Sequence, residues 1–180
     1  MSTIMTVVQH DNPIFTYSML LATKTYPNKL DRDGDTAVHI AIRENNLEIL
    51  QTLLQHNVSR NQTKIVPIVT IFGLQADPNI PNHFGKFPLH IAVENNLLPL
   101  VKVLVDHGLD VDARDQVAGR TAIHLAVERQ LEDMVFFLVK EAKVELLRED
   151  YNGVNAIELA DNCNSTNIKK LLAKEHKRQI

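Results

Sequence analysis

One pattern recurs four times along the chain and constrains its fold more than any other feature of the sequence. Each copy reads Gly, a variable residue, Thr, Phe or Asn, then Ala or Pro, an aliphatic residue, His or Glu, another aliphatic residue and Ala. The copies begin at Gly34, Gly85, Gly119 and Gly153. The steps between these glycines are 51, 34 and 34 residues, so the first step holds one period and 17 extra residues. A fixed period of this size is typical of a solenoid, in which each unit buries its apolar face only by stacking on its neighbours.

Each copy continues into a second amphipathic segment. Ile49-Leu50 and Leu53-Leu54 follow the first motif, and the same spacing recurs after the second and third motifs. Apolar pairs four residues apart lie on one face of a helix. The pair Asn45-Asn46 lies between the two segments, where Asn tolerates the left-handed conformation of a helix end. Each copy is therefore expected to be a short helix, a turn and a second helix.

The repeat resembles the ankyrin repeat, a unit of about 33 residues with the motif Thr-Pro-Leu-His-x-Ala. The similarity extends from about Asp31 to Leu172. It implies an all-α ankyrin-repeat solenoid with an N-terminal capping segment over residues 1–30 and a repeat domain over 31–180. We expect a capping helix over 13–25, because Pro27 would end it. The expected repeats are at about 31–63, 75–114, 115–148 and 149–180.

The extra residues form an insertion at about 58–74. The stretch from Ile65 to Leu74 is apolar and rich in β-branched residues, which favours a strand by propensity. Pro67, however, suits the first position of a helix. Because residues 75–85 match the loop that precedes an ankyrin helix pair, we expect an inserted outer helix over 67–74. It would pack on the convex side or dock a partner.

Composition and motifs exclude several classes of function. A single cysteine, Cys163, rules out an internal disulfide and a four-cysteine zinc site. No apolar run is long enough for a membrane span, and no signal peptide is recognisable, so a cytoplasmic or nuclear location is expected. None of the common hydrolase, metalloprotease or phosphate-binding motifs occurs. The sequence therefore predicts no enzyme, no cofactor, no metal and no small-molecule substrate.

The eight histidines have a structural explanation for the most part. His39, His90 and His124 occupy equivalent places in three repeats, with Thr36 and Thr121 three residues before two of them. A hydroxyl or a backbone group there is a natural hydrogen-bond partner for the imidazole. His107 lies among three aspartates, as in a metal cluster, but a solvated loop accounts for the same pattern.

Charge is distributed unevenly around the net value of −3. Residues 106–161 carry 13 acidic and 6 basic side chains, which disfavours direct binding to nucleic acid. Residues 162–180 carry five basic side chains and one acidic side chain. This basic end is either a solvated helix end near the negative pole of the helix dipole, or a nuclear import signal or phosphate contact.

The polar residues outside the repeat motif are the candidates for a protein-binding face. In a solenoid they lie on the inner helices and loop tips, where Arg and Tyr are common binding hot spots. Each of them alone could equally be a solvated surface residue. The candidates are Asp33, Asp35, Arg43, His83, Lys86, Glu94, Asp112, Arg114, Asp115, Gln116, Arg120, Glu128, Arg129, Tyr151 and Asn155.

Three stretches resemble the inhibitor-of-NF-κB (IκB) family more narrowly. Residues 31–42 are similar to its opening repeat, residues 117–128 to a late repeat with Ala-Gly-Arg-Thr-Ala, and Tyr151-Asn-Gly153 to the start of the next. The resemblance implies an inhibitor that binds Rel/NF-κB dimers and blocks their nuclear import or DNA binding, as in immune signalling and transcription regulation. Acidic residues would complement the basic surface of such a dimer.

The chain departs from typical IκB proteins in several ways. It has fewer repeats, a basic end in place of an acidic tail, and the insertion at 58–74. It also has no Asp-Ser-Gly-x-x-Ser motif near its N-terminus, which predicts resistance to phosphorylation-driven removal. These features fit a short viral IκB mimic, a nuclear IκB-like cofactor or a fragment. The alternative function is a generic ankyrin adaptor that docks another client or a ubiquitin-ligase component.

Overall fold

The computed structural model describes residues 28–54 and 76–179, and within these residues the chain forms helices and no strands. The all-α expectation is confirmed. The helices form four consecutive pairs: α3 (Ala37–Arg43) with α4 (Leu47–Leu54), α6 (Pro88–Glu94) with α7 (Leu98–Asp106), α8 (Ala122–Glu128) with α9 (Glu132–Lys140), and α10 (Ala156–Asp161) with α11 (Thr166–Gln179). The capping helix expected over 13–25 and the inserted helix expected over 67–74 lie outside the described residues.

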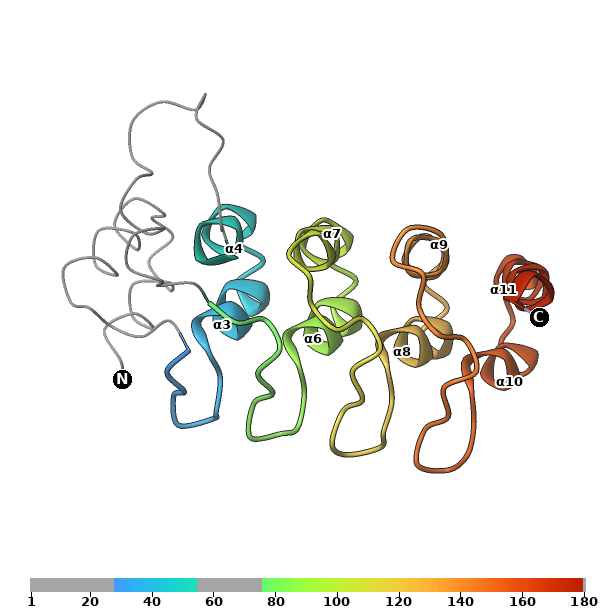
Figure 1. Ribbon diagram of the computed structural model, residues 1–180, viewed down its shortest axis with the longest axis horizontal. Helices are drawn as coiled ribbons and strands as arrows, with labels where there is room; N and C mark the ends of the chain where they lie inside the picture. The colour runs from blue at the N-terminus through green and yellow to red at the C-terminus, as the bar shows by residue number, and fades with distance from the viewer. Residues whose placement is uncertain (1–27, 55–75, 180) are drawn as a thin grey trace, which may run out of the picture.

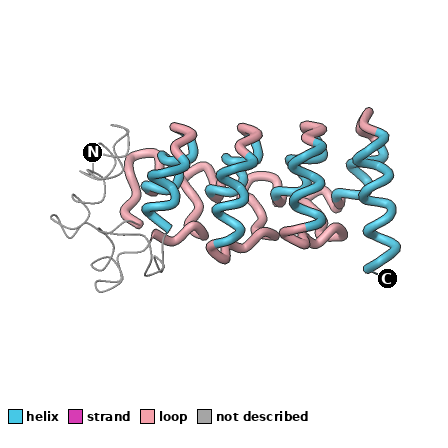
Figure 2. The backbone as a smooth tube through the Cα atoms, turned by 90° about the horizontal axis from the view of Figure 1, so that it is seen from above, coloured by secondary structure: helices cyan, strands magenta, loops and turns pink. Residues whose placement is uncertain are grey.

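The helix pairs stand in a row and form two layers (Figure 1). The shorter helices α3, α6, α8 and α10 make the inner layer, and α4, α7, α9 and α11 make the outer layer. Seen from above, the outer helices lie side by side along the row (Figure 2). The loop before each inner helix extends away from the outer layer, and we call these loops fingers one to four: residues 28–36, 76–87, 107–121 and 141–155.

A left-handed residue ends the inner helix in the first three pairs. Asn45, Asn96 and Gln130 have φ angles of 52°, 55° and 56°. They lie at equivalent places in the repeat, eleven residues after the finger glycine. This conformation reverses the chain, so that the outer helix packs back against the inner one. The left-handed conformation predicted for the pair Asn45-Asn46 is confirmed at Asn45, and Gln130 adopts it without the advantage of a short side chain.

The hydrophobic core runs along the whole row between the two layers. Inner helices contribute small and β-branched side chains, and the outer helices contribute leucines such as Leu50, Leu104 and Leu138, which are fully buried. Successive inner helices contact one another, α3 with α6, α6 with α8 and α8 with α10. Burial of one leucine side chain contributes about 1.5–3 kcal/mol. The core is therefore held by contacts between neighbouring repeats.

A chain of histidines connects each repeat to the next one. The backbone N–H of Thr36 donates to Nδ1 of His39 at 3.1 Å, and its hydroxyl lies 2.9 Å from the same nitrogen. Because Nδ1 accepts, Nε2 carries the proton and donates to the carbonyl oxygen of Lys86 in the second finger, at 3.2 Å. His90 and His124 reach the next finger in the same way, at 2.9 Å and 3.1 Å.

The second repeat lacks the threonine of this arrangement. Phe87 stands in its place, and its backbone N–H donates to Nδ1 of His90 at 3.3 Å. The two rings lie 5.7 Å apart between centroids, tilted by 44°. The aromatic ring thus packs beside the imidazole where the first and third repeats have a hydroxyl. The inter-repeat hydrogen bond of His90 is retained.

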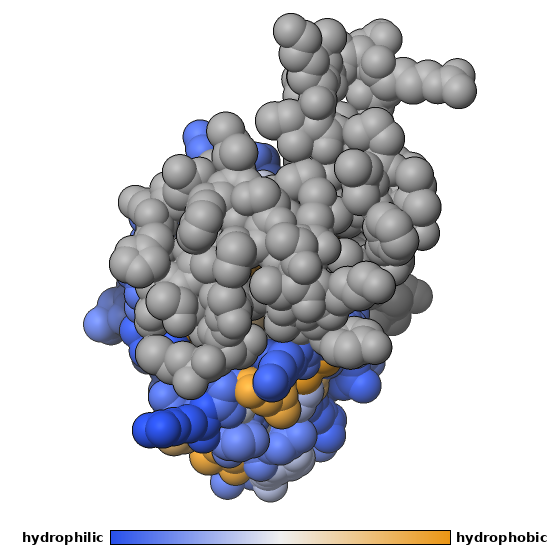
Figure 3. Space-filling model, turned by 90° about the vertical axis from the view of Figure 1, so that its left-hand side faces the viewer, coloured by the Kyte–Doolittle hydropathy of each residue, from blue (hydrophilic) through white to orange (hydrophobic). Residues whose placement is uncertain are grey.

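No helix within residues 28–54 and 76–179 is long and apolar enough to cross a membrane. Viewed onto the end of the row near α3, the described part of the surface is mostly hydrophilic with small separate apolar areas (Figure 3).

Candidate protein-binding face

The tip of each finger begins with an Asp or Asn that holds it. Asp31, Asn82, Asp115 and Asp150 all accept hydrogen bonds from backbone N–H groups further along their own finger. Asp115 is the clearest case, because Oδ1 accepts from the N–H groups of residues 117, 118 and 119 at 2.9, 2.6 and 3.1 Å. These contacts are made by short side chains that reach their own backbone, which suits Asp and Asn at the start of a turn.

The third finger is one residue longer than the others at its tip. Three residues separate Asp115 from Gly119, whereas two separate Asn82 from Gly85 and Asp150 from Gly153. The turn is closed by a hydrogen bond from Gly119 N to the Asp115 carbonyl oxygen at 3.2 Å. The longer turn projects Val117, whose residue surface is 72% exposed.

Large apolar side chains are exposed on three consecutive fingers. Phe84, Val117 and Tyr151 are 62%, 72% and 61% exposed. Each lies one or two residues before the finger glycine. We call these three residues the finger-tip row. Exposed apolar and aromatic side chains in a row of this kind are typical of a surface that another protein covers.

The fingers stack on one another through backbone hydrogen bonds. His83 N donates to Asp33 O at 3.1 Å, Gln116 N to Gly85 O at 2.9 Å, and Tyr151 N to Ala118 O at 2.9 Å. Side chains of the later finger lie over the glycine of the earlier one. A Cβ atom on Gly119 would lie 2.4 Å from Cδ1 of Tyr151. The Tyr151 ring can therefore lie against the preceding finger only because residue 119 is a glycine.

Ion pairs connect a finger to the end of its own inner helix, eight residues further on. Asp35 pairs with Arg43, Lys86 with Glu94, and Arg120 with Glu128. Nζ of Lys86 lies 2.7 and 2.8 Å from the two carboxylate oxygens of Glu94. The first pair has the acid in the finger, and the other two have the base there. Six predicted contact residues are therefore paired with each other, and their charges cancel where the fingers meet the ends of the inner helices.

Two of the predicted residues are buried, contrary to what a contact residue needs. Asp35 is fully buried and also accepts from Nδ2 of Asn82 at 2.9 Å, and Asp115 is buried under its own finger tip. Asp112 is half-buried, which raises the pKa of its carboxyl, and its Oδ1 accepts from Glu145 N at 2.9 Å. These carboxylates hold the fingers in place, and a direct part in partner binding stays a prediction.

The remaining predicted residues lie at different places on the face. Arg129 donates to the Glu94 carbonyl oxygen at 3.0 Å and so connects two inner helix ends. The side chain of Asn155 accepts from the N–H groups of Ile157 and Glu158 at the start of α10. The exposed ones, besides Arg43, Glu128 and Arg129, are Asp33, His83, Arg114, Gln116 and Tyr151. They lie in the fingers, close to the finger-tip row.

Phe84 and Val117 belong to this face and were missed in the set of polar candidates. Phe84 could have been found, because a large apolar residue directly before a turn glycine has no core to enter. Val117 depends on the extra residue of the third finger. The extra residue is recognised in the sequence only when the Asp or Asn that starts each finger tip and the glycine that follows it are both aligned between repeats.

The structure offers no metal site within residues 28–54 and 76–179, where no group of three or more His, Cys, Asp or Glu side chains is close enough to hold an ion. Nδ1 of His107, the histidine that lies among aspartates in the sequence, donates to the Val103 carbonyl oxygen at 2.7 Å. Cys163 is buried and donates to the Ser165 carbonyl oxygen.

A family model described as ankyrin repeats in three copies matches residues 4–115 and 58–150 of the chain. The chain belongs to the ankyrin-repeat family. The helix pairs, fingers and histidine chain described above are consistent with this assignment. The ankyrin-repeat fold is a scaffold for protein interaction.

Several ankyrin-repeat proteins of the NF-κB system are similar to this chain. The NF-kappa-B inhibitor cactus of Drosophila melanogaster is 30% identical over 115 residues, which cover 57% of this chain and 23% of that protein. The NF-kappa-B p105 subunit of Mus musculus is 36% identical over 93 residues, covering 52% and 8%. The mouse B-cell lymphoma 3 protein homolog is 30% identical over 103 residues, covering 57% and 20%. The matches thus span less than a quarter of the length of these curated relatives.

A solved structure confirms the ankyrin-repeat fold. The ankyrin repeat domain of Bcl-3, described as a unique member of the IκB family, superposes with a TM-score of 0.80 at 24% sequence identity. The superposition covers 96% of this chain and 68% of that domain. The superposition thus supports the ankyrin-repeat fold, and the similarity to proteins of the NF-κB system comes from the curated relatives.

Proposed function

We propose that this ankyrin-repeat protein is an IκB-like inhibitor that binds Rel-homology dimers through its fingers and blocks their nuclear import or DNA binding. The finger-tip row is the observation that carries a docking function. It offers three exposed apolar side chains on rigid, hydrogen-bonded fingers, which lowers the conformational entropy lost on binding. A cytoplasmic or nuclear site of action follows from such a partner.

The identity of the partner is supported by the relatives. The Drosophila match is named as an inhibitor of NF-κB, and the mouse p105 match is a subunit of NF-κB. The motif at residues 31–42 and the motif at 117–128 occur in the same order as in IκB proteins. Docking of a Rel dimer on the fingers would account for both the similarity to these relatives and the exposed finger-tip row.

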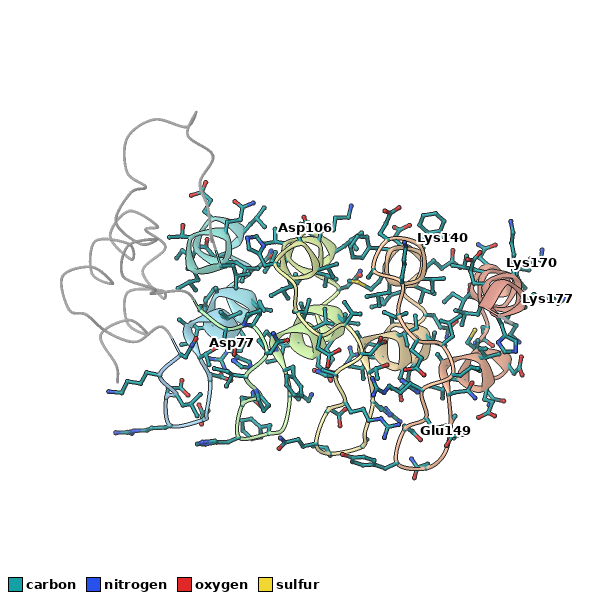
Figure 4. The ribbon with its side chains drawn as sticks, viewed as in Figure 1. Asp77, Asp106, Lys140, Glu149, Lys170 and Lys177 are labelled. Carbon is teal, nitrogen blue, oxygen red and sulfur yellow. The ribbon has the colours of Figure 1, made fainter. Side chains whose placement is uncertain are left out.

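Charge on the fingers adds to this proposal. The exposed acidic side chains of the fingers include Asp33, Asp110, Glu145 and Glu149. Glu149 lies in the fourth finger, below the inner layer in Figure 4. A Rel dimer has a basic import segment and a basic DNA-binding surface, so acids around an apolar row would steer association and fix orientation. These exposed acids, rather than the half-buried Asp112 and the buried Asp115, are the residues to reverse in a test.

Binding to a purified Rel-homology dimer tests the proposal directly. We expect the double variant Phe84→Ser/Tyr151→Ser to bind at least about tenfold more weakly, because interface hot spots contribute about 2 kcal/mol or more each. Asp33→Lys/Glu149→Lys should mainly slow association at low salt. Phe136→Ser, an exposed aromatic change on the outer layer, is the matched control. Full affinity of the finger double variant, with an unchanged melting curve, would exclude docking on the finger-tip row.

A generic ankyrin adaptor is the second candidate, because similarity is not confined to the NF-κB system. The neurogenic locus notch homolog protein 1 of Xenopus tropicalis is 30% identical over 88 residues, covering 48% of this chain and 3% of that protein. An adaptor would use the same finger-tip row for a different client. Absence of binding to any Rel-homology dimer, together with capture of one defined client that Phe84→Ser/Tyr151→Ser loses, would favour this function.

A further inference from the structure

An aromatic ridge lies on the outer layer, away from the fingers. Phe136 of α9 is 54% exposed, although α9 packs into the core through Met134, Val135 and Leu138. A groove lies on each side of this ring, one toward α7 and one toward α11. The fingers extend from the opposite side of the molecule (Figure 1). The docking face proposed above therefore leaves this region free.

The groove toward α7 is apolar at its base and acidic along α9. Leu98 and Phe137 line it with Phe136, and its volume is about 450 Å³. Asp133 and Glu141 stand along its α9 side. Its basic residue is Lys102 of α7, whose Nζ lies 5.7 Å from the centre of the Phe137 ring. Two carboxylates and one ammonium group leave this groove with a negative balance.

The groove toward α11 is smaller and its walls are fixed at both ends. Ile168 and Leu171 of α11 line it, with a volume of about 210 Å³. At one end, Glu132 accepts from the hydroxyl of Ser165 and from Nδ2 of Asn167. These hydrogen bonds lower the pKa of Glu132, so this carboxylate stays charged.

Lys140 of α9 pairs with Glu175 of α11 near the other end. Lys140 is labelled beside α9 in Figure 4. Because α9 and α11 are joined by polar contacts at both ends, the groove between them is preformed. The cleft on the α11 side of Phe136 is thus held at both ends, and less ordering is needed there when a ligand enters.

We propose that this outer surface, the two grooves flanking Phe136, is a second docking site that takes a basic amphipathic helix with one apolar anchor residue. The carboxylates of Glu132, Asp133 and Glu141 select positive charge, and Phe136 with the groove floors takes the anchor. A helix laid on an apolar groove is a common form of peptide recognition. The occupant is a segment of another protein.

The spacing of the acids specifies the pattern of the ligand. Asp133 lies in the first turn of α9, and Glu141 directly follows its last residue, eight positions later, which corresponds to about 12 Å at 1.5 Å per residue. Their positions lie on the same side of the helix as Phe137. A partner helix lying along α9 meets both acids when two basic residues are seven or eight positions apart. Its apolar anchor then lies midway between them.

A designed peptide provides the probe. It is an alanine-rich helix with a fluorescent label, two arginines eight residues apart and a leucine midway between them. We expect saturable binding by fluorescence anisotropy, and no binding of the same peptide with glutamates in place of the arginines. Phe136→Ser and Asp133→Lys/Glu141→Lys should each weaken binding at least about tenfold, the range expected for loss of a central anchor or of its charge partners.

Controls separate this site from the fingers. Phe84→Ser/Tyr151→Ser and Asp106→Lys should leave peptide binding unchanged, since these exposed residues do not line either groove. Equal binding of the acidic and basic peptides, or full affinity of the Phe136→Ser variant, would overturn the proposal. A concentration-dependent dimer that Phe136→Ser abolishes would overturn it too, because the occupant would then be a second copy. The peptide assay does not involve a Rel dimer, so its outcome is independent of whether the protein binds one.

Discussion

Each imidazole of the histidine chain is held in one protonation state by its two neighbours. Nδ1 of His124 faces the backbone N–H of Thr121 at 3.2 Å, and Nε2 faces the carbonyl oxygen of Val154 at 3.1 Å. A second proton on the ring would point at an N–H donor. Burial lowers the pKa of His39, His90 and His124 below the ordinary value of 6.5, despite the carbonyl groups that raise it.

This arrangement gives the stability of the protein a defined pH dependence. The folded pKa values are below the unfolded value, so the unfolded chain binds more protons as the pH falls through about 6.5. Stability is fully present above that pH and should decrease below it. Urea denaturation across this range measures the effect. His90→Gln should lower stability at neutral pH but flatten the slope, and a slope unchanged from that of the wild type would contradict a part for His90.

At the scale of one repeat, the motif predicts the helix pair but not the contacts between finger and helix. The Thr36 and Thr121 hydroxyls were predicted as partners of His39 and His124, and this is confirmed. The pairing of Lys86 with Glu94 could not be predicted from the sequence. Lys86 lies in the finger and Glu94 at the end of α6, and no local sequence pattern defines the angle between finger and helix that brings them together. The finger-tip row was missed in part for a similar reason. It depends on tertiary stacking and on one extra residue in the third finger.

The stacking of the fingers can be tested with a pair of glycines. Gly119 and Gly108 both have left-handed φ angles, of 71° and 74°. A Cβ at Gly119 meets the Tyr151 ring, whereas a Cβ at Gly108 meets nothing within 4 Å. Alanine should cost about 1 kcal/mol or more at either site through backbone strain, and clearly more at Gly119. Thermal or chemical denaturation of both variants measures the difference.

The binding readout of the same variants completes this test. Gly119→Ala should also weaken binding of the partner that uses Tyr151, because the ring must move. Gly108→Ala should not. Equal stability and equal binding of the two variants would show that the tyrosine ring does not depend on the preceding glycine.

For the whole molecule, the main helix contacts within residues 28–54 and 76–179 join each repeat to its neighbours, so stability is approximately a sum over neighbours. Each inner helix contacts the inner helix of the adjacent repeat, and in the outer layer α4 contacts α7 and α9 contacts α11. The sequence allowed this architecture to be predicted because its period, motif and second helix agree. It did not define the structure of the segments at 1–30 and 58–74, where the glycine-to-alanine motif does not recur. Those assignments stay predictions.

Leucines of the outer helices provide the test at this scale. Leu104→Ala and Leu138→Ala should each lower the free energy of unfolding by about 2–5 kcal/mol, through lost transfer energy and a cavity. Phe136→Ala, a similar truncation at an exposed position, should lower it by far less. Denaturant titration distinguishes these outcomes. A loss below about 0.5 kcal/mol at Leu104 would place that residue outside the core.

The histidine chain also has a direction, and this direction coincides with that of protein synthesis. Each imidazole finds its carbonyl acceptor in the finger of the following repeat, so a nascent chain that stops after α7 leaves Nε2 of His90 without the carbonyl oxygen of Arg120. In the fourth repeat Glu158 occupies the place of the histidine and turns back to the N–H of Asn155, its own helix start. A ribosome-bound intermediate is therefore incomplete at its newest repeat until the next finger has emerged. The fourth repeat is the first that satisfies this group within itself.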